Sequence, residues 1–285
     1  MLDTEKILEA IDAFTQTEPE ESYQIHIPSQ KGKLRNYLGL SGIGEECPRN
    51  LWYQWRQVFT EPIMPRMRRL WRRGDREEYA FVFLLRGIGF TIFEVDADGK
   101  QFKVTDFNGH LSGHSDGVGK APLNFWIKSH KPVPFLLEFK TYNKNRFGTL
   151  RSKGVAKSDP KYYVQMQGYM GYENLTGALF CAVCKDDDHL YFEWVPFKKS
   201  AFQAKVLDRA EDTITSMVPP DRIANSISDF RCKWCKAKEV CFKGAPAIKS
   251  CRSCKFAEPA ENASWVCKKG GEYGTLCAKY KDITK

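Results

Sequence analysis

The chain has 285 residues with a formal net charge of +9, ten cysteines and 42% hydrophobic residues. This length allows one substantial hydrophobic core with appendages rather than two full domains. No apolar run is long enough to cross a membrane, and residues 1–10 are acidic and amphipathic, unlike a signal peptide. We therefore expect a cytoplasmic protein, in the cytosol of a bacterium or a phage-infected host, with no membrane partner.

We expect three regions along the chain. Residues 1–36 predict an amphipathic helix and a polar linker, which either pack on the core or form an arm that binds a partner. Residues 37–248 predict the main core, and residues 249–285 a small cysteine-rich tail.

A helix is predicted over Trp71–Arg86, with Phe81, Val82 and Leu85 forming its apolar stripe. Glu78 lies three to four residues before two of these and therefore on the same side, with Glu77 as the alternative. A basic run leads into this helix. Its positive charges could deliver a DNA strand to the site, and the predicted DNA contacts there are Arg68, Arg69, Arg72 and Arg73.

Two predicted strands carry the most informative residues. His110–Val118 predicts a strand and a glycine-containing turn around Asp116, and Phe135–Lys140 predicts a buried strand. Side chains alternate along a strand, so Glu138 and Lys140 share one face. If the segments pair like a hairpin, Asp116 and Glu138 meet. Two carboxylates can gather a hard divalent cation, and Lys140 supplies positive charge beside a scissile phosphate. A turn aspartate and a surface ion pair would each be ordinary explanations alone, but the ordered set favours metal-dependent phosphodiester cleavage.

The following segments complete an α/β pattern. A basic loop offers Lys144 and Arg146 as further DNA contacts, and Tyr162–Tyr172 predicts a helix with Gln165 and Tyr169 on one face. The later elements are two strands, Leu179–Val183 and Leu190–Val195, joined by a turn at 185–188, and a helix over Ala201–Met217.

The order Gly113-His-Ser-Asp116, Glu138-Phe-Lys140 and Gln165-Met-Gln-Gly-Tyr169 resembles the RecB-like branch of the PD-(D/E)XK nuclease superfamily, over roughly residues 37–241. The resemblance implies a restriction-endonuclease-like α/β core with a mixed central sheet flanked by helices. It implies Mg²⁺ or Mn²⁺ held by Asp116, Glu138, the Phe139 carbonyl and Glu78. Gln165 and Tyr169 would hold the DNA backbone. The CRISPR-module relatives carry a metal-ligating histidine in the helical motif, where this chain has Asp75.

Eight of the ten cysteines predict metal sites, because paired thiols in a cytosolic chain are more often metal ligands than disulfides. The other two, Cys181 and Cys184, lie in an apolar strand and are expected in the core. One cysteine before the core and three after it resemble the iron–sulfur subset of the superfamily, similar to CRISPR-adaptation and AddB-type nucleases. This implies a 4Fe–4S cluster, with zinc as the alternative, on Cys47, Cys232, Cys235 and Cys241.

The last four cysteines predict a small zinc ribbon or knuckle, because so short a polar tail could not bury enough core to fold without a bound metal or another cross-link. They are Cys251, Cys254, Cys267 and Cys277. An alternative grouping pools the seven C-terminal cysteines and leaves Cys47 as a buried thiol. Residues 231–285 hold 13 Lys and Arg against 5 Asp and Glu, a net +8. This charge, with Trp234, Trp265 and Tyr273, could bind phosphates and stack on bases.

Together these features predict a Mg²⁺- or Mn²⁺-dependent deoxyribonuclease, first an exonuclease acting on single-stranded DNA or free DNA ends in recombination, replication or repair. A phage origin and a recombination or replication protein partner are compatible with this prediction. The alternatives are a structure-specific endonuclease and a DNA-binding scaffold subunit with a vestigial nuclease core.

Overall fold

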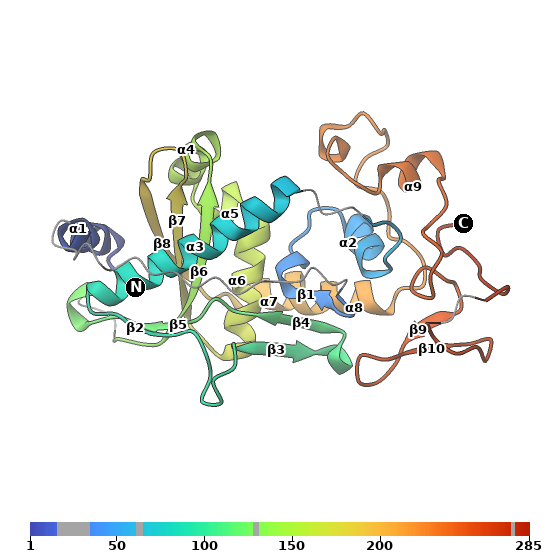
Figure 1. Cartoon of the computed structure of the whole chain (residues 1–285), viewed down its shortest axis with the longest axis horizontal. Coiled ribbons are helices and arrows are strands. Elements are labelled where there is room, and N and C mark those ends of the chain that lie inside the picture. Colours follow the sequence, from blue (N-terminus) through green and yellow to red (C-terminus); the bar gives the residue numbers. More distant parts are fainter. Residues whose placement is uncertain (16–34, 61–64, 128–130, 275–276) are drawn as a thin grey trace. The chain divides into compact units, whose positions relative to one another are not determined.

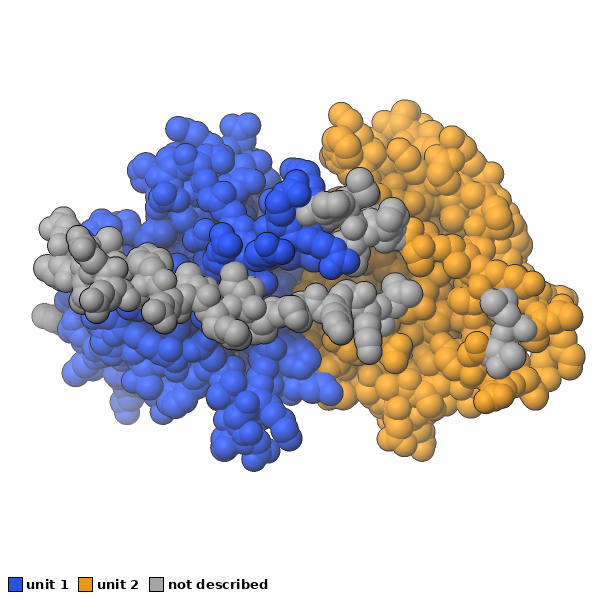
Figure 2. Space-filling view, viewed as in Figure 1, with its two compact units in different colours: residues 1–33, 63–104, 114–202 blue, residues 34–62, 105–113, 203–285 orange. Residues whose placement is uncertain are grey.

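The computed structural model describes residues 1–15, 35–60, 65–127, 131–274 and 277–285. The chain forms two compact units, shown in different colours in Figure 2. The first unit contains residues 1–33, 63–104 and 114–202, and the second contains residues 34–62, 105–113 and 203–285. Each unit is therefore assembled from segments far apart in the sequence. The division into regions ending at residues 36 and 248 stays a prediction.

The first unit is built on a five-stranded mixed sheet of order β2-β5-β6-β7-β8. The strands are β2 (Thr91–Phe93), β5 (Val118–Lys120), β6 (Phe135–Tyr142), β7 (Gly177–Cys184) and β8 (Leu190–Pro196). Only β6 and β7 pair in parallel within this sheet, and the other neighbours are antiparallel. The predicted mixed sheet is confirmed, as are the strands expected around Glu138, Leu179 and Leu190.

Helices cover both faces of this sheet (Figure 1). On one face α3 (Pro65–Gly87) packs against β6, and α1 (Thr4–Thr15) packs against β8 and α3. On the other face lies α6 (Pro160–Glu173), which belongs to the connection between the parallel strands. The shorter helices of this unit are α4 (Lys144–Lys153), α5 (Val155–Ser158) and α7 (Lys199–Phe202).

Burial along β6 follows from the alternation of its side chains. Phe135, Leu137 and Phe139 enter the core shared with α1 and α3, and the Phe139 ring stacks on Phe81 at 5.4 Å between centroids. Ile7 of α1 joins the same core, so the N-terminal helix packs on the sheet. The polar linker of residues 16–34 lies outside the described residues. The opposite face of β6 is left for the polar residues discussed below.

The second unit is built from shorter elements. It contains α2 (Pro48–Trp55), α8 (Asp208–Thr215), α9 (Lys238–Lys243) and the hairpin of β9 (Ala257–Pro259) and β10 (Trp265–Cys267). A three-stranded sheet of order β1-β4-β3 lies mostly in this unit and comprises β1 (Leu38–Gly39), β3 (Lys103–Asp106) and β4 (Leu111–His114). The single helix predicted over 201–217 is wrong in detail, because a π-helical turn at Gln203–Leu207 separates α7 from α8. Across the described ranges, no helix is both long and apolar enough to span a membrane.

Candidate active site

Glu138 and Lys140 lie on the same face of β6, as alternation along the strand predicts. The Glu138 side chain is fully buried, and its carboxylate forms an ion pair with the Lys140 ammonium. Lys140 Nζ also donates to the Phe139 carbonyl at 2.9 Å. It lies 3.9 Å from Asp116 Oδ2. The ammonium is therefore surrounded by two carboxylates and a backbone carbonyl.

Asp116 reaches this cluster from the turn that precedes β5. Its Oδ2 accepts a hydrogen bond from the Phe139 backbone N–H at 3.1 Å, which fixes the carboxylate beside β6. The next residue, Gly117, has a φ of +147°, and a Cβ there would lie 2.8 Å from the Phe93 carbonyl oxygen. Only glycine fits this bend without displacing backbone. The predicted glycine turn and the pairing of the two segments are both observed.

Helix α6 supports the cluster from the other side. Gln165 Nε2 donates to both carboxylate oxygens of Glu138, at 2.8 and 3.1 Å. The Tyr162 ring lies 5.1 Å from Lys140 Nζ, within range of a cation–π contact. Our sequence analysis did not single out Tyr162, although its position three residues before Gln165 places it on the same helix face.

Tyr169 was expected to hold DNA, but only 2% of its side chain is exposed. It packs within the first unit, and its contact with the DNA backbone stays a prediction.

Helix α3 contributes Glu78. Burial, and then repulsion from Asp116, raise the pKa of Glu78 to about 8, while Lys140 opposes the shift. Asp75 and Glu138 add smaller repulsions. Glu78 is thus close enough to the cluster to share its electrostatics.

The alternative on this helix, Glu77, points to different neighbours. It forms an ion pair with Arg73 at 3.7 Å, and Asp188 is the carboxylate that affects it. Burial raises its pKa, with Arg73 opposing. The structure brings Glu78 to the cluster and leaves Glu77 outside it.

Burial is the main cause of the raised pKa of both Glu78 and Glu138, and repulsion from Asp116 adds to it. Burial raises the pKa of Glu138 to about 7, against the opposing effect of Lys140. Burial disfavours the ammonium of Lys140, but Glu138 and Asp116 raise its pKa overall.

Carboxylates and a carbonyl directed at one small volume are the oxygen donors that Mg²⁺ and Mn²⁺ prefer. Among the described residues, no three His, Cys, Asp or Glu side chains are arranged as a finished metal site. In the carboxylate cluster, Lys140 stands between two of the donors.

The predicted basic DNA contacts fall into two groups. Arg68, Arg69 and Arg72 are exposed on α3. The other three have partners within the first unit: Arg73 donates to the Lys185 carbonyl at 2.9 Å, Lys144 lies 3.5 Å from Asp187, and Arg146 is paired with Asp159. We expect the first group to be the freer to meet phosphate.

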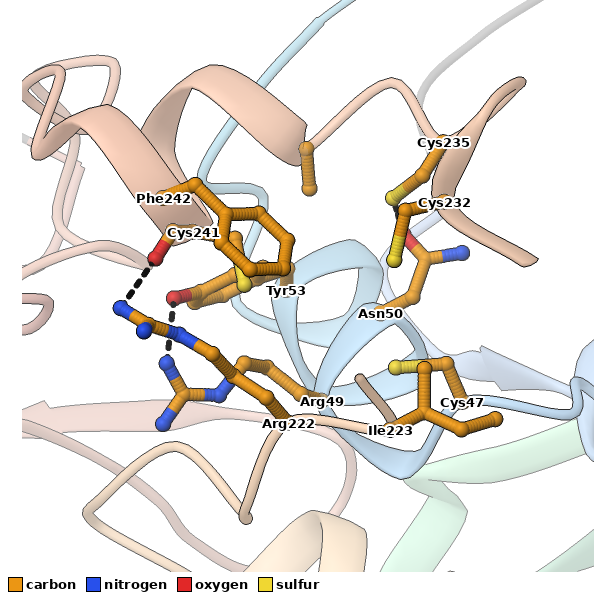
Figure 3. A pocket seen from close by; sticks show the side chains of 11 residues that line it. Cys47, Arg49, Asn50, Tyr53, Arg222, Ile223, Cys232, Cys235, Cys241 and Phe242 are labelled. Carbon is orange, nitrogen blue, oxygen red and sulfur yellow. Dashed lines mark hydrogen bonds between the residues drawn. The ribbon is translucent and has the colours of Figure 1, made fainter. Parts of the chain in front are cut away.

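The first set of cysteines lines one pocket of the second unit (Figure 3). Cys47 precedes α2, and Cys241 lies on α9. Cys232 ends the short 3₁₀ turn Phe230–Cys232, and Cys235 follows it. Burial, followed by the charges of Asp229, Cys47 and Cys241, raises the pKa of Cys232. The fold therefore brings Cys47 to the three later cysteines despite 184 intervening residues between Cys47 and Cys232.

The second set also lines one pocket of the second unit, which contains Cys251, Cys254, Cys267 and Cys277. The two cysteines expected to be structural, Cys181 and Cys184, are buried in β7 as predicted. The two tryptophans of residues 231–285 differ in exposure. Trp234 is 80% exposed, whereas Trp265 is 6% exposed, so the Trp265 ring is not open to stack on a base.

The sequence matches no protein-family model and no curated protein. Similar solved structures include SSO0001, at 16% identity and a TM-score of 0.39, with 85% of this chain and 96% of that chain covered. They also include LHK-Exo in complex with dAMP, at 16% identity and a TM-score of 0.43, covering 63% and 87%. A further structure of this alkaline exonuclease, from Laribacter hongkongensis, has 18% identity and a TM-score of 0.39, covering 62% and 86%. Similarities at this level assign neither a family nor an activity.

Proposed function

We propose that this chain is a Mg²⁺- or Mn²⁺-dependent DNA nuclease of the RecB-like PD-(D/E)XK type. The observation that carries the proposal is the cluster of Glu78, Asp116 and Glu138 around Lys140. The charge of Asp116 adds to the raised pKa of Glu78 and of Glu138, and three acidic side chains at one point favour any cation that neutralises them. A network with no ligand to bind would gain little from burying a carboxylate as completely as Glu138.

The chain's own groups have separable roles. A bound divalent ion would supply Lewis acidity and an activated water at the scissile phosphate. Asp116, Glu138 and the Phe139 carbonyl are the proposed ligands, with Glu78 acting directly or through water. Gln165 holds the Glu138 carboxylate in one orientation, which makes it a positioning residue rather than a DNA ligand.

Lys140 acts through its charge in this proposal. Its raised pKa keeps the side chain protonated at neutral pH. A permanent ammonium suits orienting a water and stabilising the negative charge that develops on phosphorus oxygens. It does not suit a general base, which must be deprotonated before it acts.

The cysteines of Figure 3 are proposed to hold a 4Fe–4S cluster, with zinc at the same residues as the alternative. Four thiols from distant segments around one pocket fit the soft ligand set that either group requires. Zn²⁺ is proposed for the second set of four.

We place the activity at DNA ends, as an exonuclease of recombination, replication or repair, and a phage-encoded origin is compatible with it. The test uses end-labelled linear DNA and covalently closed circles, each single- and double-stranded, with anaerobically purified protein. Lys140→Ala is assayed beside Glu77→Gln, a control on the same unit outside the cluster. Metal-dependent loss of linear substrate alone, absent in Lys140→Ala, is the expected result.

Two other results would change the proposal. Cutting of circles would make the protein a structure-specific endonuclease. DNA binding without cleavage by any variant would make it a scaffold subunit and would remove the catalytic roles given above.

A further inference from the structure

Two buried arginines lie side by side in the second unit. Arg56 follows α2 and is fully buried, and Arg252 lies between Cys251 and Cys254 and is 4% exposed. Burial lowers the pKa of each guanidinium to about 10, and charge repulsion from Arg252 lowers the pKa of Arg56 further. Burying one cation is costly, and burying two together requires compensating negative charge.

The hydrogen bonds of these arginines go to neutral acceptors. Arg56 Nη2 donates to the carbonyls of Cys254 and Ala257, at 2.8 and 3.0 Å. Arg252 donates to the carbonyls of Asn36, at 3.2 Å, and Trp55. The carbonyls satisfy only part of the guanidinium donors, since the buried Nε of Arg56 and of Arg252 has no hydrogen-bond partner, and they do not cancel the charge.

Aromatic rings enclose the same pair. The Arg252 guanidinium lies 4.2 Å from the ring centroids of both Trp55 and Trp265, and Arg56 lies 5.1 Å from Trp265. These rings exclude water from the charges, so solvent screens them weakly.

No carboxylate in the described part of the chain forms an ion pair with Arg56 or Arg252. Glu258 is near enough to affect Arg56, but its carboxylate is paired with Lys268. The remaining source of negative charge close by is the second set of cysteines. Arg56 bonds the backbone of Cys254, and Arg252 is the residue between two of the thiols.

The loops around this pocket already have features of a thiolate site. Cys251 Sγ accepts a hydrogen bond from the Gly274 backbone N–H at 3.2 Å, and the Cys254 N–H donates to the Cys251 carbonyl at 3.0 Å in a tight Cys-x2-Cys turn. A Zn²⁺ ion held by four thiolates carries a formal charge of two minus, which equals the opposite charge of two arginines.

We propose that Cys251, Cys254, Cys267 and Cys277 form a tetrathiolate Zn²⁺ centre whose counter-charges are Arg56 and Arg252. Zinc binding releases the thiol protons to solvent, and the buried guanidinium groups stabilise the resulting dianion. The proposal rests on the assignment of these four cysteines as metal ligands and is independent of nuclease activity. Because Arg56 follows α2 and Arg252 binds the Trp55 carbonyl, the centre also ties α2 to the tail.

The test measures zinc rather than cleavage. Zinc and iron are quantified in the purified full chain, and zinc affinity is measured by competition with a chromophoric chelator. Arg56→Met and Arg252→Met are compared with Lys249→Met, which removes one positive charge from an exposed position of the same segment.

We expect one zinc per chain, lost in Cys254→Ser. We expect each arginine variant to weaken zinc binding about 10- to 100-fold, as loss of a neighbouring support typically does. Lys249→Met should leave zinc affinity unchanged. Arg56→Lys keeps the positive charge and should retain most of the zinc affinity that Arg56→Met loses.

Other outcomes would overturn the proposal. Unchanged zinc affinity in both arginine variants would remove the counter-charge role. Iron in place of zinc, lost in Cys254→Ser, would remove the zinc assignment. Cobalt added to the metal-free wild type gives a check that needs no variant: absence of thiolate-to-cobalt absorption would remove the site itself. None of these results bears on the Lys140 assay, so the two proposals fail separately.

Discussion

Glu78→Gln should stabilise the metal-free protein at alkaline pH, because it removes a carboxylate that the fold prefers protonated. The folded pKa of Glu78 is raised from 4.5 to about 8. Below about pH 4 the group is protonated in both folded and unfolded chains and adds no penalty. As pH rises from 4.5 to 8, ionisation favours the unfolded chain, and stability falls.

The size of this effect follows from the shift. At about 1.4 kcal/mol per tenfold change in ionisation constant, Glu78 costs the fold about 4 kcal/mol at pH 8. For a chain of this size, 4 kcal/mol corresponds to about 8–16 °C in unfolding temperature. Glu78→Gln should therefore raise the unfolding temperature by about that amount at pH 8 and leave it nearly unchanged at pH 4. Glutamine keeps the shape of the side chain and removes only its charge.

The assay is thermal unfolding of the first unit across this pH range, with chelator and with Mg²⁺, using Glu77→Gln as the matched control. Mg²⁺ at about 100 times its dissociation constant should stabilise the wild type by about 2.7 kcal/mol at pH 8. It should stabilise Glu78→Gln much less, because one ligand is missing. An equal pH dependence in wild type and Glu78→Gln, or a larger effect in Glu77→Gln, would refute the placement of Glu78 in the cluster.

Three further outcomes are expected. Lys140→Ala and Asp116→Ala should each abolish cleavage while folding and bound iron are retained; cleavage by either variant would remove its catalytic role. Cys235→Ala should lose iron and lower the unfolding temperature, measured by metal analysis and calorimetry, and an unchanged iron content would contradict the cluster. Trp234→Ala should weaken binding of single-stranded DNA by about 1–3 kcal/mol in a fluorescence titration, since the ring is 80% exposed. Val218→Ala, another exposed apolar side chain, serves as the control, and an equal loss there would argue against stacking.

Local patterns in the sequence were sufficient for the elements of the first unit. The period of two along Phe135–Tyr142 placed Glu138 and Lys140 on one face and Phe139 on the other, as observed. The helical period likewise placed Gln165 and Tyr169 on one face of their helix. These relations hold within one element or one turn, where side-chain direction follows from backbone geometry alone. Tyr162 was not predicted as a site residue, because it belongs to none of the motifs from which the site was predicted.

Other features depended on which distant segments pack together. The helical phase alone left the choice between Glu77 and Glu78 open, and the choice followed from how α3 lies against the turn that carries Asp116. Trp265 looked like a base-stacking residue in the sequence, yet the tail folds so that its ring covers Arg252.

The buried arginine pair shows the same limit most clearly. Nothing in the local sequence around Arg56 or Arg252 predicts that they meet, since 195 residues separate them in the chain. Residue spacing fixes which side chains share a face of one helix or strand. Only the packing of segments against each other decides which charges become neighbours and lose contact with water, and the chemistry of both proposed metal sites depends on those neighbours.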